Sequence, residues 1–454
     1  MLDKCITGVI ARGLFPLQEH LKGHHTVAAR RFLEQSQWWS ASELHAYQNR
    51  KLSQFMQKIV RTVPYYRLVF EEKGLKPEQI QSIEDLQLLP FLTKSIIRSH
   101  HQALIANEAE DLSLFNTGGS TGEPLQFYLG KERITQDVAA KWRATRWWDV
   151  DIGDREIVVW GSPIEVGAQD RMRGLRDRLF RSKLLSAFEL SQSNLAAFVQ
   201  VIQDYKPKML FGYPSALAVI AEYARTNNIK LNDLGIKVAF VTSEKLYPDQ
   251  EKSISEMFNC PVANGYGGRD AGFIAHACPS GGMHITAEDI IVEIINDEDQ
   301  QAAPGELGEI VVTHLATGDY PFVRYRTGDL GILDSTPCEC GRGLPVLKAI
   351  QGRTTDFLYA TDGSLVHALA LIYVLRETEE IAAFKIVQVE KYKINILYVS
   401  AQTETPLNAH AIEAQFKKRL GSSMEFCFKQ IDVIEPGQSG KMKYVENRLL
   451  GHPN

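Results

Sequence analysis

The sequence predicts an α/β fold: a large N-terminal domain of parallel-rich sheet and helices that includes a β-rich subdomain, then a small α+β domain at the C-terminus. In the first half of the chain, short apolar runs alternate with helical patterns, which is typical of a largely parallel sheet. From Asp289 onwards the pattern changes to strands and turns. The C-terminal part reads as two strands, a helix and a strand, which is enough for a small domain.

Domain boundaries follow from these changes of pattern and from the length of the chain. A chain of 454 residues exceeds the size at which a single core keeps growing, so we expect at least two domains. The N-terminal domain is expected at residues 1–352, with the β-rich subdomain at about residues 285–350. The small, mobile C-terminal domain is expected at residues 353–454, with a hinge near residues 352–356.

The expected elements follow this order along the chain. Residues 1–60 carry apolar residues at helical spacing between many charges, so they are expected to be helical. Prolines mark helix junctions within residues 63–67 and 89–94. Later patterns predict helices at 136–148, 171–183, 214–224 and 409–420, and strands at 157–160, 209–211, 238–241, 290–295, 308–312, 322–333, 382–389, 393–400 and 425–434.

Composition excludes several classes of protein. The content of hydrophobic residues, 44%, and of charged residues, 23%, is that of an ordinary globular protein. A net charge of −5 argues against a general nucleic-acid binder. No apolar run reaches the length of a membrane span, and the N-terminus lacks a secretory pattern, so a cytoplasmic location is expected. Six cysteines in a chain of this length are not a disulfide framework. The oligomeric state is left open, with a homodimer as one option.

The stretch Asn116-Thr117-Gly118-Gly119-Ser120-Thr121-Gly122-Glu123-Pro124 combines three glycines with hydroxyl side chains, between two short apolar runs. Glycines let successive backbone N–H groups converge into an anion site, and the hydroxyl groups add donors. The interpretation as a phosphate-binding loop competes with an ordinary hairpin loop, because the same residues are common in turns. The stretch is not a Walker loop, since the Gly-Lys-Ser/Thr ending is missing.

Polar tips follow the expected parallel strands, and ligands bind at the carboxyl ends of such strands. The expected substrate pocket is therefore lined by residues at these tips, and by the glycine-rich stretch that follows the third strand. Gly265-x-Gly267 does not fit a dinucleotide-binding motif, because Asp270 occupies the place of the third glycine. The pocket residues expected are Tyr213, Ser243, Glu244, Gly267 and Gly268.

Taken together, five stretches resemble the adenylate-forming (AMP-binding) ligase superfamily, and within it the phenylacetate–CoA ligase-like group, with its capsule-biosynthesis branch the most similar. The resemblance runs from Val63-Pro64-Tyr65-Tyr66-Arg67 to Lys441, nearly the whole chain. Its strongest elements, in family order, are residues 117–124, residues 266–270, Arg324-Tyr325-Arg326-Thr327-Gly328-Asp329-Leu330, Gly352-Arg353 and Ser439-Gly440-Lys441.

The resemblance implies a role for each matching residue. Thr117, Gly118, Gly119, Ser120, Thr121 and Gly122 would hold the β- and γ-phosphates of ATP. Tyr266, followed by Gly267, would stack on adenine, and Asp270 would hold Mg²⁺. Asp329 would accept hydrogen bonds from the ribose hydroxyls, and Arg353 would reach the same sugar. Lys441 would bridge the carboxylate substrate and the α-phosphate, so Lys441 and Asp270 are the expected catalytic residues.

The reaction implied is ATP-dependent activation of a carboxylic acid to an acyl-adenylate, with release of pyrophosphate, followed by transfer to coenzyme A. An amine, a sugar or a carrier protein is the alternative acceptor, and a non-catalytic nucleotide-binding partner is the alternative of another class. Glu123 stands where many relatives carry Lys, and Thr355 occupies a usually acidic hinge position, so both depart from the family pattern. Trp160 and Tyr213 suggest an apolar or aromatic acid, although aromatic residues are more often core.

Three thiols and one imidazole form a candidate structural zinc site. Five residues separate Cys278 from His284, and Cys338-Glu339-Cys340 follows in a glycine-rich turn. A Cys-x-Cys pair in a reducing compartment holds metal more often than it forms a disulfide. His276 is an alternative ligand to His284, and small buried cysteines near a turn are the alternative to a metal site.

Overall fold

The computed structural model describes residues 2–116, 125–160, 170–187, 192–353, 357–362, 365–401, 406–434 and 444–449. The chain forms two compact units. The first comprises residues 1–118 and 124–351, and the second comprises residues 119–123 and 352–454. The α/β class predicted from the sequence is confirmed, with a large central sheet and helices in the first unit and an α+β second unit.

The N-terminal region is helical, as predicted. A capping box begins the long helix α4 (Ala41–Thr62): the Ser40 hydroxyl accepts from the backbone N–H of Glu43, and the Glu43 carboxylate accepts from the N–H of Ser40. Pro64 then occupies the first turn of α5. The helices of this region are α1 (Leu2–Val9), η1 (Ile10–Leu14), α2 (Phe15–Leu21), α3 (Thr26–Ser36), α4, α5 (Pro64–Lys73), η2 (Pro77–Gln79), η3 (Ile83–Leu88) and α6 (Lys94–Ser99).

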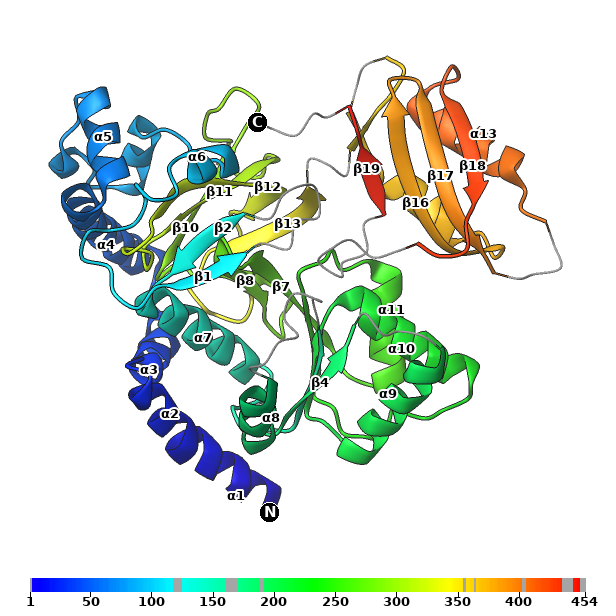
Figure 1. Ribbon diagram of the computed structural model, residues 1–454, viewed down its shortest axis with the longest axis horizontal. Helices are drawn as coiled ribbons and strands as arrows, with labels where there is room; N and C mark the ends of the chain where they lie inside the picture. The colour runs from blue at the N-terminus through cyan, green and yellow to red at the C-terminus, as the bar shows by residue number, and fades with distance from the viewer. Residues whose placement is uncertain are drawn as a thin grey trace. The chain divides into compact units, whose positions relative to one another are not determined.

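One mixed sheet organises the first unit, with strand order β10-β11-β12-β13-β9-β8-β7-β6-β5-β3-β4 among the described residues (Figure 1). Strands β4, β3, β5, β6 and β7 pair in parallel, as the alternation of strands and helices predicts. These strands are β3 (Glu156–Trp160), β4 (Ser182–Ser186), β5 (Met209–Gly212), β6 (Val238–Thr242) and β7 (Val262–Gly268). A helix was expected over residues 171–183. The helix α8 (Asp170–Leu179) ends earlier, and β4 begins at Ser182, inside that range.

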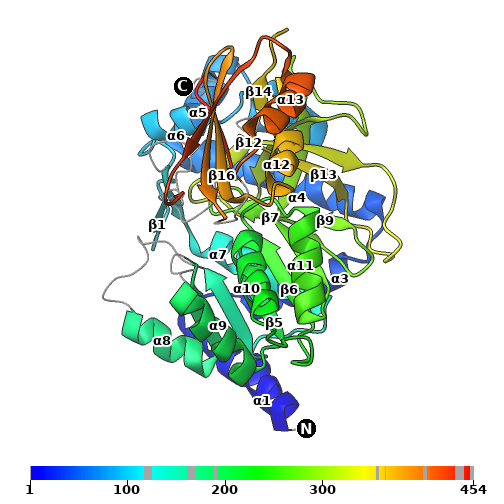
Figure 2. The ribbon, with the colours of Figure 1, turned by 90° about the vertical axis from the view of Figure 1, so that its right-hand side faces the viewer.

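The two faces of the parallel strands are covered by different helices. Alternate residues of β3, β5 and β6 pack on α9 (Gln192–Tyr205), α10 (Pro214–Thr226) and α11 (Pro248–Phe258), which lie together over these strands in Figure 2. The other residues of β5 and β6, such as Phe211 and Phe240, pack beside Ala144 of α7 (Lys131–Arg146). Strands buried on both faces explain why Met209–Gly212 is apolar throughout.

The strands expected as a separate β-rich subdomain continue the same sheet. Their pairings are antiparallel, and β9 joins them to β8 and so to the parallel strands. A shared sheet edge provides more backbone hydrogen bonds than an isolated subdomain would, since each added strand satisfies a row of N–H and C=O groups. The strands of the antiparallel part of the sheet are β8 (Gly272–Ala277), β9 (Met283–Ile285), β10 (Ile290–Ile295), β11 (Gly308–His314), β12 (Phe322–Asp334) and β13 (Val346–Arg353).

A separate antiparallel hairpin carries the glycine-rich stretch. Strands β1 (Ser113–Asn116) and β2 (Gln126–Leu129) pair from Ser113 with Leu129 to Asn116 with Gln126. The two strands predicted around the loop are therefore present. The loop itself, residues 117–124, lies outside the described residues.

A buried ion pair ties helices of the first unit to the sheet. Arg143 of α7 donates to the Glu288 carboxylate over 2.6 Å, and Ser36 at the end of α3 donates to the same oxygen over 2.6 Å. Both charged side chains are about 1% exposed or less. Removing one partner of such a pair leaves an uncompensated buried charge, so the pair fixes how α3 and α7 pack.

The second unit has a four-stranded sheet of order β18-β17-β16-β19. The long strands β16 and β17 form an antiparallel pair, and β18 and β19 add in parallel at the two edges. Phe416 of α13 packs edge-on against Phe426 of β18 at 5.4 Å between ring centroids. The elements are β14 (Phe357–Tyr359), β15 (Leu365–His367), α12 (Leu369–Arg376), β16 (Ile381–Glu390), β17 (Lys393–Ser400), α13 (Ala409–Leu420), β18 (Glu425–Gln430) and β19 (Val445–Asn447).

Candidate active site and metal centre

The parallel strands end side by side at one edge of the sheet, where the sequence predicts a pocket. At the end of β5, a Cβ atom on Gly212 would lie 2.3 Å from the carbonyl oxygen of Val159, so only glycine fits. Tyr213 follows and stacks on Trp160 from the end of β3, with ring centroids 4.4 Å apart and an interplanar angle of 27°. The structure thus forms an aromatic pair from two of the predicted strand ends.

The end of β6 turns sharply before α11. Ser243 has a φ of +71°, a conformation that a residue other than glycine adopts at a cost. The Glu244 carboxylate that follows accepts a hydrogen bond of 3.3 Å from the backbone N–H of Ser215, in the first turn of α10. A carboxylate at a helix N-terminus is favourable, because it meets unpaired N–H groups and the positive end of the dipole. Glu244 therefore links the tips of two neighbouring strands.

The hairpin between β7 and β8 places the predicted magnesium ligand. A Cβ atom on Gly267 would lie 2.1 Å from the carbonyl oxygen of Gly272, so the close approach of the two strands requires glycine. Asp270 sits at the tip and accepts a hydrogen bond of 2.7 Å from the hydroxyl group of Tyr325. Its other oxygen accepts from the N–H of Ala271 over 3.1 Å. Carboxylate oxygens are the ligands that a hard cation such as Mg²⁺ prefers, so Asp270 has the chemistry that the predicted role requires.

Tyr266 and Asp329, both predicted to contact the nucleoside part of ATP, touch each other in the structure. The hydroxyl group of Tyr266 donates to the Asp329 carboxylate over 2.9 Å. Burial, followed by the nearby Asp329 charge, holds the pKa of the Tyr266 hydroxyl well above its ordinary value, so the phenol stays a donor. Asp329 follows Gly328, which has a φ of +78°, and its N–H donates to the Thr327 hydroxyl.

Strand β12 brings these two contacts together, because Tyr325 and Asp329 belong to the same strand. Tyr325 binds Asp270 and Asp329 binds Tyr266, so four residues from the β7–β8 hairpin and β12 form one polar cluster. The arrangement presents two carboxylates, an aromatic ring and backbone groups around one place. Such a set suits a nucleotide and a divalent cation.

The sequence did not point to Arg133 of α7, which supports this cluster. Its side chain is 1% exposed and pairs with Asp137 over 2.8 Å. Two of its nitrogens donate to the carbonyl oxygens of Arg269 and Asp270 over 3.3 and 3.4 Å. The sequence around Arg133 gives no signal for this role, because the two carbonyl groups that it binds are more than 130 residues away in the chain.

The Leu-Pro-Phe-Leu-Thr-Lys stretch at residues 89–94 also supports strand β12. Leu92 pairs with Tyr325 in a short parallel bridge, and Phe91 lies within 4.1 and 4.5 Å of the guanidinium groups of Arg324 and Arg326. Arg324 makes two further bonds, of 3.2 and 2.9 Å, to the buried Glu293 carboxylate. The alternating arginines of the Arg-Tyr-Arg stretch thus anchor the strand that carries Asp329.

Several predicted site residues lie outside the described residues. These are Thr117, Gly118, Gly119, Ser120, Thr121 and Gly122 of the glycine-rich stretch, Lys441 near the C-terminus, and Thr355 at the expected hinge. For Arg353 the structure describes the backbone, at the end of β13, but not the side chain.

The four predicted metal ligands do converge. One ligand atom each from Cys278, His284, Cys338 and Cys340 lies within 4.8 Å of all the others. The sulfur atoms of Cys278 and Cys338 are 3.7 Å apart, and His284 Nε2 is 3.1 Å from the Cys340 sulfur. All three cysteines are free thiols. His276 is not in this group; its ring stacks on Phe273 instead.

The surroundings prepare this group for a cation. His284 Nδ1 lies 3.2 Å from the Leu344 carbonyl, which fixes the proton there and leaves Nε2 facing the thiols. Burial lowers the pKa of His284 to about 4, so the ring is neutral at neutral pH and its lone pair is free. Burial raises the pKa of the Cys278 thiol to about 11, and a bound cation would reverse that shift. A Cβ atom on Gly282 would lie 2.6 Å from the Cys338 sulfur, so glycine leaves room for it.

Comparison with known proteins agrees with the fold. Residues 47–317 match the AMP-binding enzyme family, and residues 358–448 match the CapK C-terminal domain. The chain belongs to the AMP-binding enzyme family, and the AMP-forming ligase class predicted from the sequence is confirmed.

Individual relatives place the chain more narrowly. It is 24% identical to Protein CapK of Staphylococcus aureus over 90% of each chain. It is 26% identical to a phenylacetate-coenzyme A ligase of Thermus thermophilus over 70% of this chain and 72% of the relative. The predicted phenylacetate–CoA ligase-like group, with its capsule branch, is therefore confirmed.

A solved structure shares the fold. The 2-hydroxyisobutyryl-CoA ligase in the postadenylation state aligns with a TM-score of 0.72 at 20% identity, over 91% of this chain and 92% of the other. Among the described residues, no helix combines the length and apolar character needed to cross a bilayer.

Proposed function

We propose that the protein activates a carboxylic acid with ATP and transfers the acyl group to coenzyme A. The observation that carries the proposal is the polar cluster of Tyr266, Asp270, Tyr325 and Asp329 at the carboxyl edge of the sheet. Its carboxylates and ring match the roles that the family resemblance gives to those positions. The relatives named as CoA ligases support the choice of acceptor.

In the first step, a carboxylate oxygen of the acid attacks the α-phosphorus of ATP, and the bond to the β-phosphate breaks to release pyrophosphate. The nucleophile is already ionised, so the step needs charge stabilisation and positioning rather than a general base. In the second step, the thiol sulfur attacks the acyl carbon, loses its proton, and AMP leaves. Asp270 would hold Mg²⁺, which supplies positive charge near the phosphates.

Asp329 would position the nucleoside by accepting from the ribose hydroxyls. Its carboxylate accepts a hydrogen bond from Tyr266, and a carboxylate can accept several hydrogen bonds at once. Glu244 and Ser243, with Gly267 and Gly268, would line the acid pocket beside the ring of Tyr213. The stack of Trp160 on Tyr213 and the phenylacetate ligases among the relatives favour a planar, apolar acid.

The test of this function is pyrophosphate exchange into ATP, measured for a panel of aryl, fatty, amino and sugar acids. We expect exchange with at least one aryl acid, and AMP release that then depends on coenzyme A. AMP release that depends instead on an amine, a sugar or a carrier protein would contradict the choice of acceptor. Absence of exchange with every acid in a chain that binds ATP would contradict adenylation itself.

Replacing Asp329 by alanine should weaken ATP binding by about ten- to a hundredfold, because hydrogen bonds to a charged group are worth roughly 1.5–3 kcal/mol. Isothermal calorimetry on the folded variant measures the loss. Asp334→Ala is the matched control, since it removes a carboxylate from the same strand, and among the described residues that carboxylate accepts from the N–H of Thr336. Equal ATP affinity in Asp329→Ala and the wild type would refute the assignment.

We also propose that Cys278, His284, Cys338 and Cys340 bind one structural Zn²⁺. Three thiolates and a neutral imidazole are a common closed zinc set, and the hydrogen bond from His284 to Leu344 gives the expected support to the histidine ligand. The ion would join the turn at residues 278–282 to the turn at residues 338–341. Its role would be to stabilise this part of the sheet rather than to take part in the reaction.

A further inference from the structure

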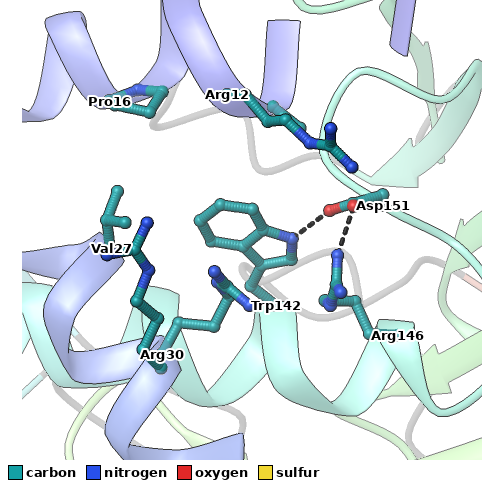
Figure 3. Close-up of a pocket in the computed structure, with 9 residues that line it drawn as sticks. Arg12, Pro16, Val27, Arg30, Trp142, Arg146 and Asp151 are labelled. Atoms are coloured by element: carbon teal, nitrogen blue, oxygen red, sulfur yellow. Dashed lines mark hydrogen bonds and ion pairs between the residues drawn. The ribbon is translucent and has the colours of Figure 1, made fainter. Parts of the chain in front are cut away.

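A cavity of about 490 Å³ lies between the N-terminal helices and the C-terminal end of α7 (Figure 3). Four of its lining residues are arginines, and the indole of Trp142 forms part of its wall. Figure 3 shows Arg12 and Arg146 on either side of the Asp151 carboxylate, which also accepts from Trp142. The lining residues are Ala11, Arg12, Pro16, Val27, Arg30, Arg31, Trp142, Arg146 and Asp151.

This cavity is separate from the proposed active site. Arg146 lies thirteen residues beyond Arg133 on the same helix, which corresponds to about 20 Å along the axis. Asp151 precedes β3, so the cavity lies towards the amino ends of the parallel strands, whereas the polar cluster lies at their carboxyl ends. None of the residues proposed for ATP, acid or zinc lines it.

The charges around the cavity do not balance. Two carboxylates, those of Glu34 and Asp151, are already engaged: Glu34 pairs with Arg30 and Arg146, and Asp151 pairs with Arg146. Within the described part of the chain, Arg12 and Arg31 have no ion pair, and the buried Nε of Arg30 has no hydrogen-bond partner. Four cations against two anions repel one another in a partly enclosed space, and an anion would relieve this.

The chemistry of the lining defines the class of anion. Guanidinium groups bind phosphate and carboxylate in a bidentate manner, and four of them suit a group with several charged oxygens. The Trp142 ring, with Arg30 at 4.6 Å from its centroid, together with Val27 and Pro16, leaves an apolar side. We propose that this cavity binds the phosphate group of a phosphate ester, with the organic part against the apolar side.

Two sources could present such a phosphate: a small soluble ester, or the headgroup of an anionic phospholipid. The second source is worth testing because the helices on either side of η1, which carries Arg12, expose apolar side chains: Val9 of α1 is 69% exposed and Leu17 of α2 is 57% exposed. An amphipathic helix with basic residues suits the surface of an anionic bilayer. Both sources require the same arginines.

The test uses the full-length protein with its nucleotide site filled by a non-hydrolysable ATP analogue, and inorganic phosphate as the probe in calorimetry. The test variant is Arg12→Ala/Arg31→Ala, and both side chains are exposed, so folding should be unaffected. The control is Arg225→Ala, an exposed arginine on α10. We expect phosphate to bind the wild type and Arg225→Ala alike, and the double variant at least about tenfold more weakly. The phosphate affinity of Arg12→Lys/Arg31→Lys should lie between those of the wild type and the alanine variant, because lysine keeps the charge but lacks the planar, bidentate donors of a guanidinium group.

A second arm sediments the same proteins with vesicles of phosphatidylglycerol or of phosphatidylcholine. Binding to the anionic vesicles that is lost in the double variant would identify a lipid headgroup as the source. Phosphate binding without sedimentation would identify a soluble ester. Equal phosphate affinity in the wild type and the double variant, or no binding in either arm, would overturn the proposal. Neither outcome depends on whether the protein activates an acid, so failure here is distinct from failure of the proposed function.

Discussion

Replacing Cys338 and Cys340 together by serine should release about one zinc ion per chain and destabilise the first unit strongly. The two residues supply half of the four ligand atoms that lie within 4.8 Å of one another. Zinc binding to structural sites is worth roughly 10–16 kcal/mol in small peptides at neutral pH, so a loss of about 5 kcal/mol is a conservative expectation. For a unit of this size the melting temperature should fall by about 10 °C.

The size of this effect follows from what the ion would connect. Cys278 and Cys338 are sixty residues apart in the chain, and their sulfur atoms lie 3.7 Å apart. A cross-link between distant residues removes entropy from the unfolded chain, so its loss costs more than the loss of a local contact. Replacing Cys340 would also remove the thiol group that Nε2 of the buried, neutral His284 faces.

Elemental analysis and thermal melting, with and without a chelator, measure both parts of the prediction. Cys427→Ser is the matched control, because Cys427 is also a half-buried free thiol but lies in the other unit. It should keep both the zinc and the melting temperature. Wild-type protein that contains no metal and melts at the same temperature after chelation would exclude a structural zinc ion.

The elements that sequence patterns predicted well are those whose environment is uniform along their length. Strand β6 (Val238–Thr242) is buried on both faces, so its first four residues are all apolar and the strand predicted at 238–241 matches it closely. Strands β16 and β17 have one buried and one open face, which produces the alternation that predicted them. In both cases the local pattern records the burial of the element.

The features that sequence patterns missed depend on residues far away in the chain. Strand β9 pairs with β13 through His284 and Val346, and this contact makes the antiparallel strands part of the central sheet. The residue pattern of β9 or of β13 does not indicate which strand it pairs with. The first turn of α7 was also missed, because Lys131-Glu132-Arg133 is polar while the Arg133 side chain is buried against Asp137 and the 269–270 backbone.

In the candidate site, too, local patterns predicted some features but not the contacts between residues that are far apart in the chain. Glycine at position 212 and the polar residues after each strand predicted where a pocket lies, since parallel strands share one edge. The contact between Tyr266 and Asp329 could not be predicted from spacing, because sixty-three residues separate them. Only the family resemblance implied that both lie near one nucleotide, and the structure shows that the two side chains are hydrogen-bonded to each other.

Lys441→Ala should reduce the rate of acyl-adenylate formation by about a hundred- to a thousandfold, the size of effect seen when one group that stabilises transition-state charge is removed. The described part of the proposed site contributes the carboxylates of Asp270 and Asp329. Carboxylates can hold a metal ion and a ribose, but they repel the negative charge that builds on the phosphate oxygens as pyrophosphate leaves. A lysine cation between the acid and the α-phosphate would offset that repulsion. Lys441 lies outside the described residues, so its role is inferred from the family resemblance.

The two half-reactions separate this role from a structural one. Transfer from a supplied acyl-adenylate to coenzyme A takes place at the acyl carbon, and no nucleophile attacks the α-phosphorus. The transition state that Lys441 would stabilise in the first step is therefore absent, so transfer should proceed in Lys441→Ala at the wild-type rate. The measurement is a pair of rates, pyrophosphate release and thioester formation from the supplied adenylate, in the wild type, Lys441→Ala and the control Lys429→Ala. Lys429 is an exposed lysine on β18 of the same unit, and its loss should change neither rate. Equal losses in both half-reactions would show that Lys441 supports the fold or both steps. Normal adenylation in Lys441→Ala would show that the cation comes from another residue, because the carboxylates alone cannot supply it.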